Sequence, residues 1–392
     1  MAVTDKKRLC VWAGLAVSHF FFAAAMANAS SNNVSGVVGN GGDVSFEDAQ
    51  NFAAGSAPSS VALGDFNGDG IADLAVANRG SSDVSVLLGN GDGSFQPASN
   101  FGVESGPPYD LVVADFNGDG VQDLAMNIGL TSSGFSVFLG NGDASFRLVW
   151  TNFVGVRGAS CLAAGDFDGD GLPDLVMAVG YNSVAVFLGN GDGTFQAPPR
   201  IEFGNDIVQC VAVADFNGDG VPDLAVTHYR GPLPPFYTSL LLGNGDGTFQ
   251  SPHTAFGDLG PVAVGDFNGD GFPDLAVFGH YSGTHISVLL GGPDGILHNR
   301  GFFDSGGTVQ SIAVGDFRGV GFADLALLHP NNLSVALGNG DGSFRLMTTS
   351  FGVGGGASSA AVGDFNGDGL PDVAVANSGT NDVSVLINNT TH

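Results

Sequence analysis

A ten-residue segment of this chain gathers oxygen-bearing side chains at a spacing suited to a hard cation. Positions 1, 3, 5 and 9 carry carboxylate or amide groups, and positions 4 and 6 are glycine; in the first copy the four polar positions are Asp65, Asn67, Asp69 and Asp73. Calcium prefers such oxygen ligands, and glycine permits the sharp backbone reversal that turns alternate side chains toward one point. Position 7, Ile71, can offer its backbone carbonyl while its side chain turns into the core. We call this segment the aspartate loop and expect it to bind calcium.

The aspartate loop is not an EF-hand. The apolar run that begins at Leu74 is typical of a strand, and the glutamate that closes an EF-hand at position 12 is missing. The alternative for the loop is a metal-free turn held by its own Asp and Asn side chains.

The loop recurs along the chain, and this repetition is the main organising feature of the sequence. Its first aspartate returns at steps of 50, 51, 49, 51, 50 and 48 residues, which is typical of a repeat architecture. Six of the copies keep all four polar positions, so we expect about six structural calcium ions. The expected ligands, with the residue at position 7 included, are Asp65, Asn67, Asp69, Ile71, Asp73, Asp115, Asn117, Asp119, Val121, Asp123, Asp166, Asp168, Asp170, Leu172, Asp174, Asp215, Asn217, Asp219, Val221, Asp223, Asp266, Asn268, Asp270, Phe272, Asp274, Asp364, Asn366, Asp368, Leu370 and Asp372.

The sixth copy differs from the others. It has Arg318 and Val320 where the other copies have Asn or Asp, so a guanidinium would stand inside the site. We expect no calcium there, and an ion pair of Arg318 with Asp316 or Asp324 instead.

The repeated pattern Asp-x-Asn-Gly-Asp-Gly-x-x-Asp-Leu resembles the FG-GAP/VCBS repeats of the integrin α-subunit β-propeller and its bacterial and fungal relatives. A Phe-Gly pair followed by Gly-Pro or Gly-Ala completes the likeness, as at residues 101–107, 256–261 and 351–357. The resemblance covers nearly the whole chain after residue 40 and implies integrin-like or lectin-like ligand binding.

The strands needed to position the loops can be placed from the sequence. Each repeat predicts four short strands, with an aspartate loop between the first and second and an Asn-Gly-Asp-Gly turn between the third and fourth. The chain begins within a repeat near residue 37 and ends at the complementary place near residue 388, so the terminal strands share one blade. We therefore expect residues 30–392 to form an all-β, seven-bladed propeller of four-stranded blades, closed by that shared blade. Phenylalanines that follow the Asn-Gly-Asp-Gly turns are expected in the core between blades; they are Phe95, Phe146, Phe195, Phe249 and Phe344.

Residues 1–29 have the pattern of a secretory signal. A basic Lys6-Lys7-Arg8 group precedes an apolar run, and Ala27-Asn28-Ala29 forms a small-x-small cleavage site. The alternative, a single transmembrane anchor, is disfavoured because Ser18 and His19 interrupt the apolar run. We expect a secreted, extracellular protein without a membrane span.

Composition narrows the function classes. The chain carries 39 acidic against 11 basic residues, and both of its lysines lie in the expected signal. No basic stripe is present, which excludes a typical nucleic-acid or anionic-membrane surface. Cys161 and Cys210 each precede the first aspartate of their loops by five residues. A disulfide between them is conceivable, but two small buried thiols are the favoured interpretation.

Strand alternation places the aspartate loops on one face of the disc and the more variable second-to-third and fourth-to-first connections on the other. We call the latter the variable face. Its aromatic and histidine residues are candidate ligand-binding groups, for carbohydrate or an extracellular protein: Tyr109, His228, Tyr229, Arg230, Phe236, Tyr237, His280, Tyr281 and His285. A binding or adhesion module is the favoured function. A polysaccharide hydrolase or lyase is the first alternative, although the sequence shows no catalytic motif, and a structural wall or matrix component is the second.

Overall fold

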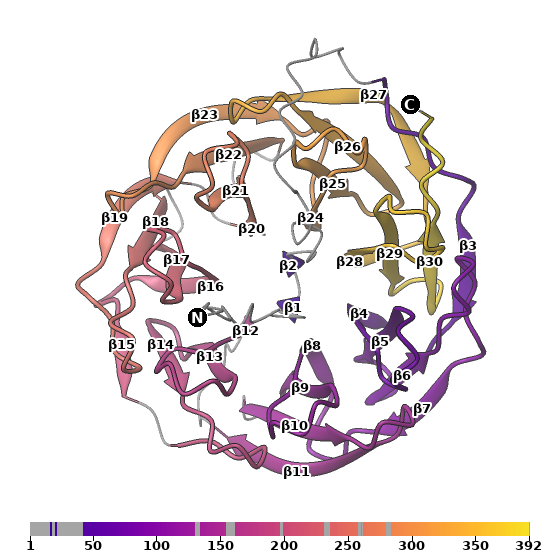
Figure 1. The fold of residues 1–392 in the computed structure, drawn as a ribbon, viewed down its shortest axis with the longest axis horizontal. Coiled ribbons are helices and arrows are strands. Elements are labelled where there is room, and N and C mark those ends of the chain that lie inside the picture. The colour runs from indigo at the N-terminus through magenta and orange to yellow at the C-terminus, as the bar shows by residue number, and fades with distance from the viewer. Residues whose placement is uncertain are drawn as a thin grey trace, which may run out of the picture.

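The computed structural model describes residues 16–17, 20–21, 42–129, 134–153, 161–196, 199–230, 236–257, 260, 262–279 and 284–391. Every named element among them is a β-strand. Seven antiparallel sheets of four strands each stand around a central axis as the blades of a propeller (Figure 1). The predicted fold class is therefore confirmed.

Each blade runs from an innermost strand beside the axis to an outermost strand at the rim. Blades 1 to 3 comprise β4 (Pro58–Gly64), β5 (Asp73–Asn78), β6 (Asp83–Leu87), β7 (Ser99–Gly102); β8 (Pro108–Ala114), β9 (Asp123–Ile128), β10 (Gly134–Gly140), β11 (Phe146–Phe153); and β12 (Leu162–Gly165), β13 (Asp174–Val179), β14 (Ser183–Phe187), β15 (Arg200–Glu202).

Blades 4 to 6 follow the same order around the ring. They comprise β16 (Ile207–Ala214), β17 (Asp223–Tyr229), β18 (Phe236–Leu241), β19 (His253–Gly257); β20 (Val262–Gly265), β21 (Asp274–Phe278), β22 (His285–Leu290), β23 (His298–Asp304); and β24 (Ser311–Gly315), β25 (Asp324–Leu328), β26 (Asn332–Gly338), β27 (Phe344–Gly352).

Blade 7 closes the ring with strands from both ends of the chain. It comprises β28 (Ala357–Gly363), β29 (Asp372–Asn377), β30 (Asp382–Leu386) and, from the N-terminal side, β3 (Gln50–Ala53). β3 pairs antiparallel with β30, and beyond it the N–H of Asn389 donates to the carbonyl of Ser45 at 3.0 Å. The shared blade predicted from the offset termini is confirmed. Because β3 pairs with β30, the edge of the last strand of the chain is covered.

The core lies between neighbouring blades, because the middle strands are buried along their length. All six residues of β5 are buried, and the same holds for β9, β13 and β29. Aromatic rings also connect neighbouring blades. The phenylalanine after the second turn of one blade packs edge-on against the phenylalanine at position 2 of the preceding blade's aspartate loop; the pairs are Phe146–Phe66, Phe195–Phe116, Phe249–Phe167, Phe344–Phe267 and Phe95–Phe365. These five rings therefore belong to the inter-blade core, as predicted.

Two short strands precede the ring. β1 (Ala16–Val17) and β2 (Phe20–Phe21) pair antiparallel near the axis of the propeller (Figure 1). Both fall within the expected secretory signal, whose remaining residues lie outside the described part of the chain. Over the described residues, no helix has the length and apolar character needed to cross a bilayer.

The two cysteines form a disulfide, so the expectation of two separate buried thiols is wrong. Cys161 and Cys210 are bonded, with their Cα atoms 5.1 Å apart. They stand at equivalent places near the start of the innermost strands of blades 3 and 4. These strands converge on the axis, so equivalent positions in adjacent blades come within bonding reach.

Candidate functional site

The first aspartate of each loop holds the loop backbone in shape. In the first copy, Oδ1 of Asp65 accepts from the N–H groups of Gly68 at 2.8 Å and Asp69 at 3.1 Å. Its Oδ2 accepts from the N–H of Gly70 at 2.9 Å. Gly68 and Gly70 have φ values of 75° and 81°, which only glycine adopts at little cost. The glycines at positions 4 and 6 therefore curl the chain around the first carboxylate.

The last aspartate of each loop joins the loop to the rest of its blade. Asp73 is 0% exposed; its Oδ2 accepts from the N–H of Phe66 at 2.9 Å and its Oδ1 from the N–H of Gly89 at 2.8 Å. Gly89 begins the turn between the third and fourth strands, so one carboxylate ties both turns of the blade together. The same pair of acceptor bonds is made by Asp123, Asp174, Asp223, Asp274 and Asp372. This bracing role is additional to the metal-ligand role predicted from the sequence.

Burial disfavours the ionised form of these last aspartates. Desolvation raises their pKa values, backbone donors lower them in part, and the other carboxylates of the loop raise them further. The pKa is about 6 for Asp73 and Asp223, and about 7 for Asp123, Asp174, Asp274 and Asp372. A cation at the loop would compensate the buried negative charge.

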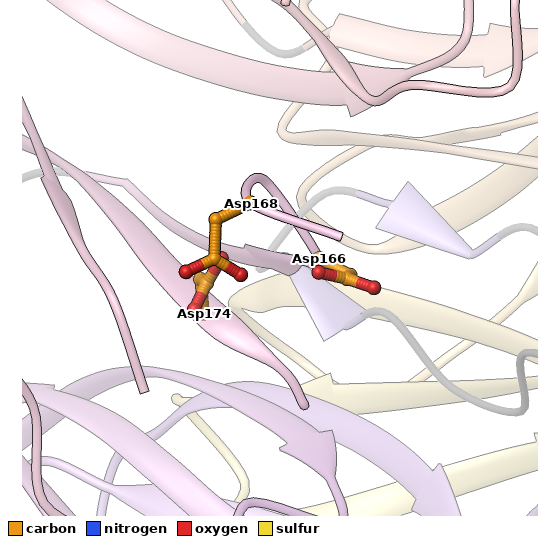
Figure 2. Close-up of side chains that lie close together, drawn as sticks. All are labelled: Asp166, Asp168 and Asp174. Atoms are coloured by element: carbon orange, nitrogen blue, oxygen red, sulfur yellow. The ribbon is translucent and has the colours of Figure 1, made fainter. Parts of the chain in front are cut away.

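The third loop has the densest carboxylate cluster among the described residues. Ligand oxygens of Asp166, Asp168 and Asp174 all lie within 4.8 Å of one another. Figure 2 shows the carboxyl groups of Asp168 and Asp174 next to each other, with Asp166 to one side. Burial, together with repulsion from Asp170 and Asp166, raises the pKa of Asp168. The donor set is oxygen alone, which fits calcium or another hard cation rather than a soft metal.

The other five intact loops have Asn at position 3, and its side chain meets the aspartate at position 5. In the first loop, Nδ2 of Asn67 donates to Oδ2 of Asp69 at 2.8 Å, and Oδ1 of Asn67 accepts from the N–H of Asp69 at 3.0 Å. At position 7, Ile71 is half-buried against the turn that begins at Gly89. Positions 1, 3 and 5 therefore form a hydrogen-bonded turn, and metal binding by the intact loops stays a prediction.

In the sixth loop, Arg318 pairs with Asp324, one of the two partners proposed from the sequence. Its Nη2 donates to Oδ1 of Asp324 at 2.7 Å, and its Nε donates to Oδ2 at 3.2 Å. Nη2 also donates to the carbonyl of Gly338 at 2.6 Å. Asp324 is fully buried, and burial raises its pKa to about 6 although Arg318 acts to lower it. The guanidinium thus supplies a positive charge beside the last aspartate of this loop.

Among the candidate ligand residues of the variable face, His228 is buried rather than exposed. The side chain is buried in blade 4, with Nδ1 3.1 Å from Oδ2 of Asp206 and Nε2 2.7 Å from Oγ of Ser239. Burial lowers the pKa of His228, although Asp206 acts to raise it. Asn78 and Asn377 stand at the same strand position in blades 1 and 7 and donate to Ser85 and Ser384. His228 therefore takes the place of a buried structural asparagine.

The residues around His228 divide between core and surface. Phe236, the first residue of β18 and a candidate ligand residue, is buried. Tyr237 is half-buried and stacks on the His228 ring, and Tyr229 is half-buried at the end of β17. The side chain of Arg230 is 70% exposed, and its Nε donates to Oδ1 of Asp206 at 2.7 Å. His228 is paired with Tyr237 in the ladder, so their side chains lie on one face of the sheet, whereas Tyr229 and Phe236 lie on the other. Each face therefore carries one buried and one half-buried residue.

The other predicted ligand residues lie on blades 2 and 5. His285 is the first residue of β22, and its ring contacts that of Phe302, which is 75% exposed on the outer strand. His280 and Tyr281 lie outside the described residues. Tyr109 is the second residue of β8 rather than part of a connection, a correction to its predicted placement.

Tyr109 has a partner that the sequence interpretation did not identify. The guanidinium carbon of Arg79, in the connection between β5 and β6 of blade 1, lies 4.5 Å from the centre of the Tyr109 ring. A comparison of equivalent connections in the repeats could have pointed to Arg79, because blade 7 has Ser378 at that place.

Comparisons with known proteins agree with the fold. The family profile described as FG-GAP-like repeat matches residues 65–126, 128–177, 166–226 and 316–375, and the FG-GAP repeat profile matches 262–294. No curated protein sequence is similar enough to the chain to count as a relative.

Solved propellers resemble the chain in fold at low sequence identity. The BBS1N domain in complex with ARL6DN has a TM-score of 0.63 and 12% identity, with 88% of this chain and 98% of that chain covered. An Agrocybe aegerita lectin that recognises non-reducing terminal N-acetylglucosamine has a TM-score of 0.55 and 20% identity, with 86% and 87% covered. Saccharomyces cerevisiae Sqt1 has a TM-score of 0.54 and 12% identity, with 88% and 97% covered. The profile matches span more than half of the sequence, and together with the seven aspartate loops they show that the chain belongs to the FG-GAP repeat family.

Proposed function

We propose that this protein is a secreted, calcium-stabilised binding module that recognises carbohydrate through its variable face. The observation that carries the proposal is the difference between the two faces of the propeller. One face repeats the same braced turns from blade to blade, whereas the other presents different side chains on each blade, among them the exposed Arg79 and Arg230 and the half-buried Tyr109 and Tyr229. Aromatic rings beside hydrogen-bond donors suit sugar rings, which offer apolar faces and hydroxyl edges. The lectin with the same fold supports the carbohydrate class.

Calcium would occupy the six intact aspartate loops, held by the side chains at positions 1, 3, 5 and 9 and the carbonyl at position 7. Each loop brings carboxylates together whose mutual repulsion a cation relieves. Binding to the folded form alone stabilises it by RT ln(1 + [L]/Kd). The sixth loop does not need the ion, because Arg318 already supplies a positive charge. Native mass spectrometry of the propeller should therefore show six calcium ions, and seven or none would contradict this assignment.

Secretion would follow from the signal-like residues 1–29, and the Cys161–Cys210 disulfide suits an oxidising compartment. Expression in a secreting host should yield a mature chain that starts at Ser30. A chain recovered from the membrane fraction with its N-terminus intact would favour an anchor instead.

An enzyme is a weaker candidate. The contacts Asp206–His228–Ser239 follow the order of a hydrolase triad, but Ser239 is 1% exposed and shares a further hydrogen bond with Thr254 at 2.8 Å. A nucleophile must reach its substrate, so this serine is part of the blade packing.

A glycan array probed with and without calcium tests the proposed function. We expect a defined set of glycans to bind in calcium and to be released by EDTA. A folded, calcium-loaded protein that binds no glycan would refute the carbohydrate assignment, and binding to extracellular matrix proteins in the same assay would favour a protein ligand.

A further inference from the structure

The contact between Arg79 and Tyr109 differs from the contacts made by Arg230, Arg300 and Arg345. Arg230, Arg300 and Arg345 each pair with a carboxylate, whereas no ion pair of Arg79 occurs among the described residues. Arg79 is exposed, and its guanidinium lies over the half-buried ring of Tyr109 in the neighbouring blade. An aromatic ring restrains a guanidinium by cation–π attraction and leaves its N–H edges free for a further partner.

The backbone that carries Arg79 is rigidly held. Nδ2 of Asn78 donates to Oδ1 of Asp83 at 2.8 Å, and the N–H of Gly80 donates to the carbonyl of Ser56 at 2.8 Å. The N–H of Arg79 itself donates to the carbonyl of Ala57 at 3.1 Å. These bonds fix the backbone at Arg79, and the Tyr109 ring restrains the guanidinium, so part of the ordering cost of binding is already met.

Tyr109 is held in an irregular part of β8. The register with β9 shifts between Pro108 and Asp110, so Tyr109 has no opposite residue in the ladder. The same shift occurs in the innermost strands of blades 1, 4 and 7, so the bulge belongs to the repeat, and blade 2 differs in placing a tyrosine there.

Blade 7 provides an internal comparison. Its connection repeats the bonds of blade 1: Nδ2 of Asn377 donates to Oδ1 of Asp382 at 2.8 Å, and the N–H of Gly379 donates to the carbonyl of Gly355 at 2.9 Å. The positions of Arg79 and Tyr109 are taken there by Ser378 and, on the next blade, by Ser59. The turn therefore forms without the arginine and the tyrosine, and a structural requirement does not explain them.

We propose that Arg79 and Tyr109 form a subsite for the carboxylate of an acidic sugar residue, an inference that rests on the proposed carbohydrate-binding function. A guanidinium fork binds a carboxylate through two parallel hydrogen bonds. The chain as a whole carries a formal net charge of −28, which repels polyanions. The subsite therefore selects a glycan with a single terminal carboxylate over a sulfated or polyuronic chain.

The test compares acidic and neutral sugars on matched variants. Glycans that end in glucuronate, galacturonate or N-acetylneuraminate are titrated against glycans that end in glucose, galactose or N-acetylglucosamine, with calcium present. We expect at least one acidic glycan to bind more tightly than its neutral counterpart. Arg79→Ser, which copies blade 7, should weaken that binding about tenfold or more, in line with the strength of a hydrogen bond to a charged group. Arg79→Lys should restore it only in part, because an ammonium lacks the planar fork.

Ser378→Ala is the matched control and should leave all binding unchanged. Circular dichroism and the melting temperature of each variant report whether the fold is intact. Equal binding of the acidic glycans by Arg79→Ser and the wild type would overturn the subsite. Binding of neutral glycans alone would also overturn it and leave the proposed function standing, whereas binding of no glycan would refute both.

Discussion

Removal of Arg318 tests how far its buried ion pair with Asp324 stabilises the sixth blade. The guanidinium makes three hydrogen bonds, two to Asp324 and one to the carbonyl of Gly338, and both charged side chains are buried. Arg318→Ala would leave the Asp324 carboxylate buried without its cation. Loss of one partner of a buried ion pair costs about 3–5 kcal/mol, and the free energy of unfolding should fall by that amount at pH 7.5.

The charge itself can be separated from the lost packing. In Arg318→Ala/Asp324→Asn the buried group is neutral, so this double variant should recover part of the stability lost by the single variant. The pH dependence has a definite sign. Asp324 has a pKa of about 6 in the folded protein, above the unfolded value, and loss of Arg318 raises it further. A raised pKa contributes stability at low pH that is lost as the pH rises through it. The cost of Arg318→Ala should therefore be smaller at pH 5 than at pH 7.5.

Urea denaturation followed by circular dichroism measures these differences, with calcium present so that the other loops are unaffected. A single variant as stable as the wild type at pH 7.5 would show that the ion pair does not compensate a buried charge. Equal losses in the single and double variants would show that packing, not electrostatics, explains the effect.

Three further expectations concern the whole ring. Chelation with EDTA at neutral pH should lower the melting temperature, because carboxylates then face one another without a cation; an unchanged melting temperature would contradict a structural role for the ion. The chelated protein should be more stable at pH 5 than at pH 8, since the pKa values of Asp123 and Asp174 are raised to about 7 and their charging disfavours the folded state; a melting temperature that does not change between these pH values would contradict this reasoning. Cys161→Ala/Cys210→Ala should lower the free energy of unfolding by about 4 kcal/mol on the loop-entropy estimate for about 50 enclosed residues, and treatment of the wild type with a reducing agent should give a similar loss in denaturant titrations.

The geometry of each aspartate loop could be predicted from the sequence, because its hydrogen bonds join residues that are close together along the chain. The first aspartate of a loop bonds to N–H groups three to five residues later, so the loop geometry follows from ten consecutive residues. Glycine at positions 4 and 6 can be recognised as a backbone requirement without knowledge of the rest of the molecule. A steady period of about fifty residues then implies identical blades, and offset termini imply closure of the ring.

Only part of the role of the last aspartate could be predicted from the sequence, because one of its two backbone partners is distant along the chain. Asp73 bonds to Phe66 within the loop, but also to Gly89 in a separate turn. The candidate ligand residues show the same limitation. His228 and Phe236 occur in a segment rich in aromatic residues, yet both are buried, because neighbouring blades cover both faces of the sheet that contains β17 and β18.

Contacts between blades depended on the tertiary structure. The sequence alone determined that there are seven similar blades, where each loop lies in its blade, and that the sixth loop carries an arginine. The packing of neighbouring blades decided that Cys161 meets Cys210 and that Arg79 lies over Tyr109. Residues about 50 and 30 positions apart meet because the blades pack side by side around an axis, and the angle between neighbouring blades is set by the packing of every pair at once.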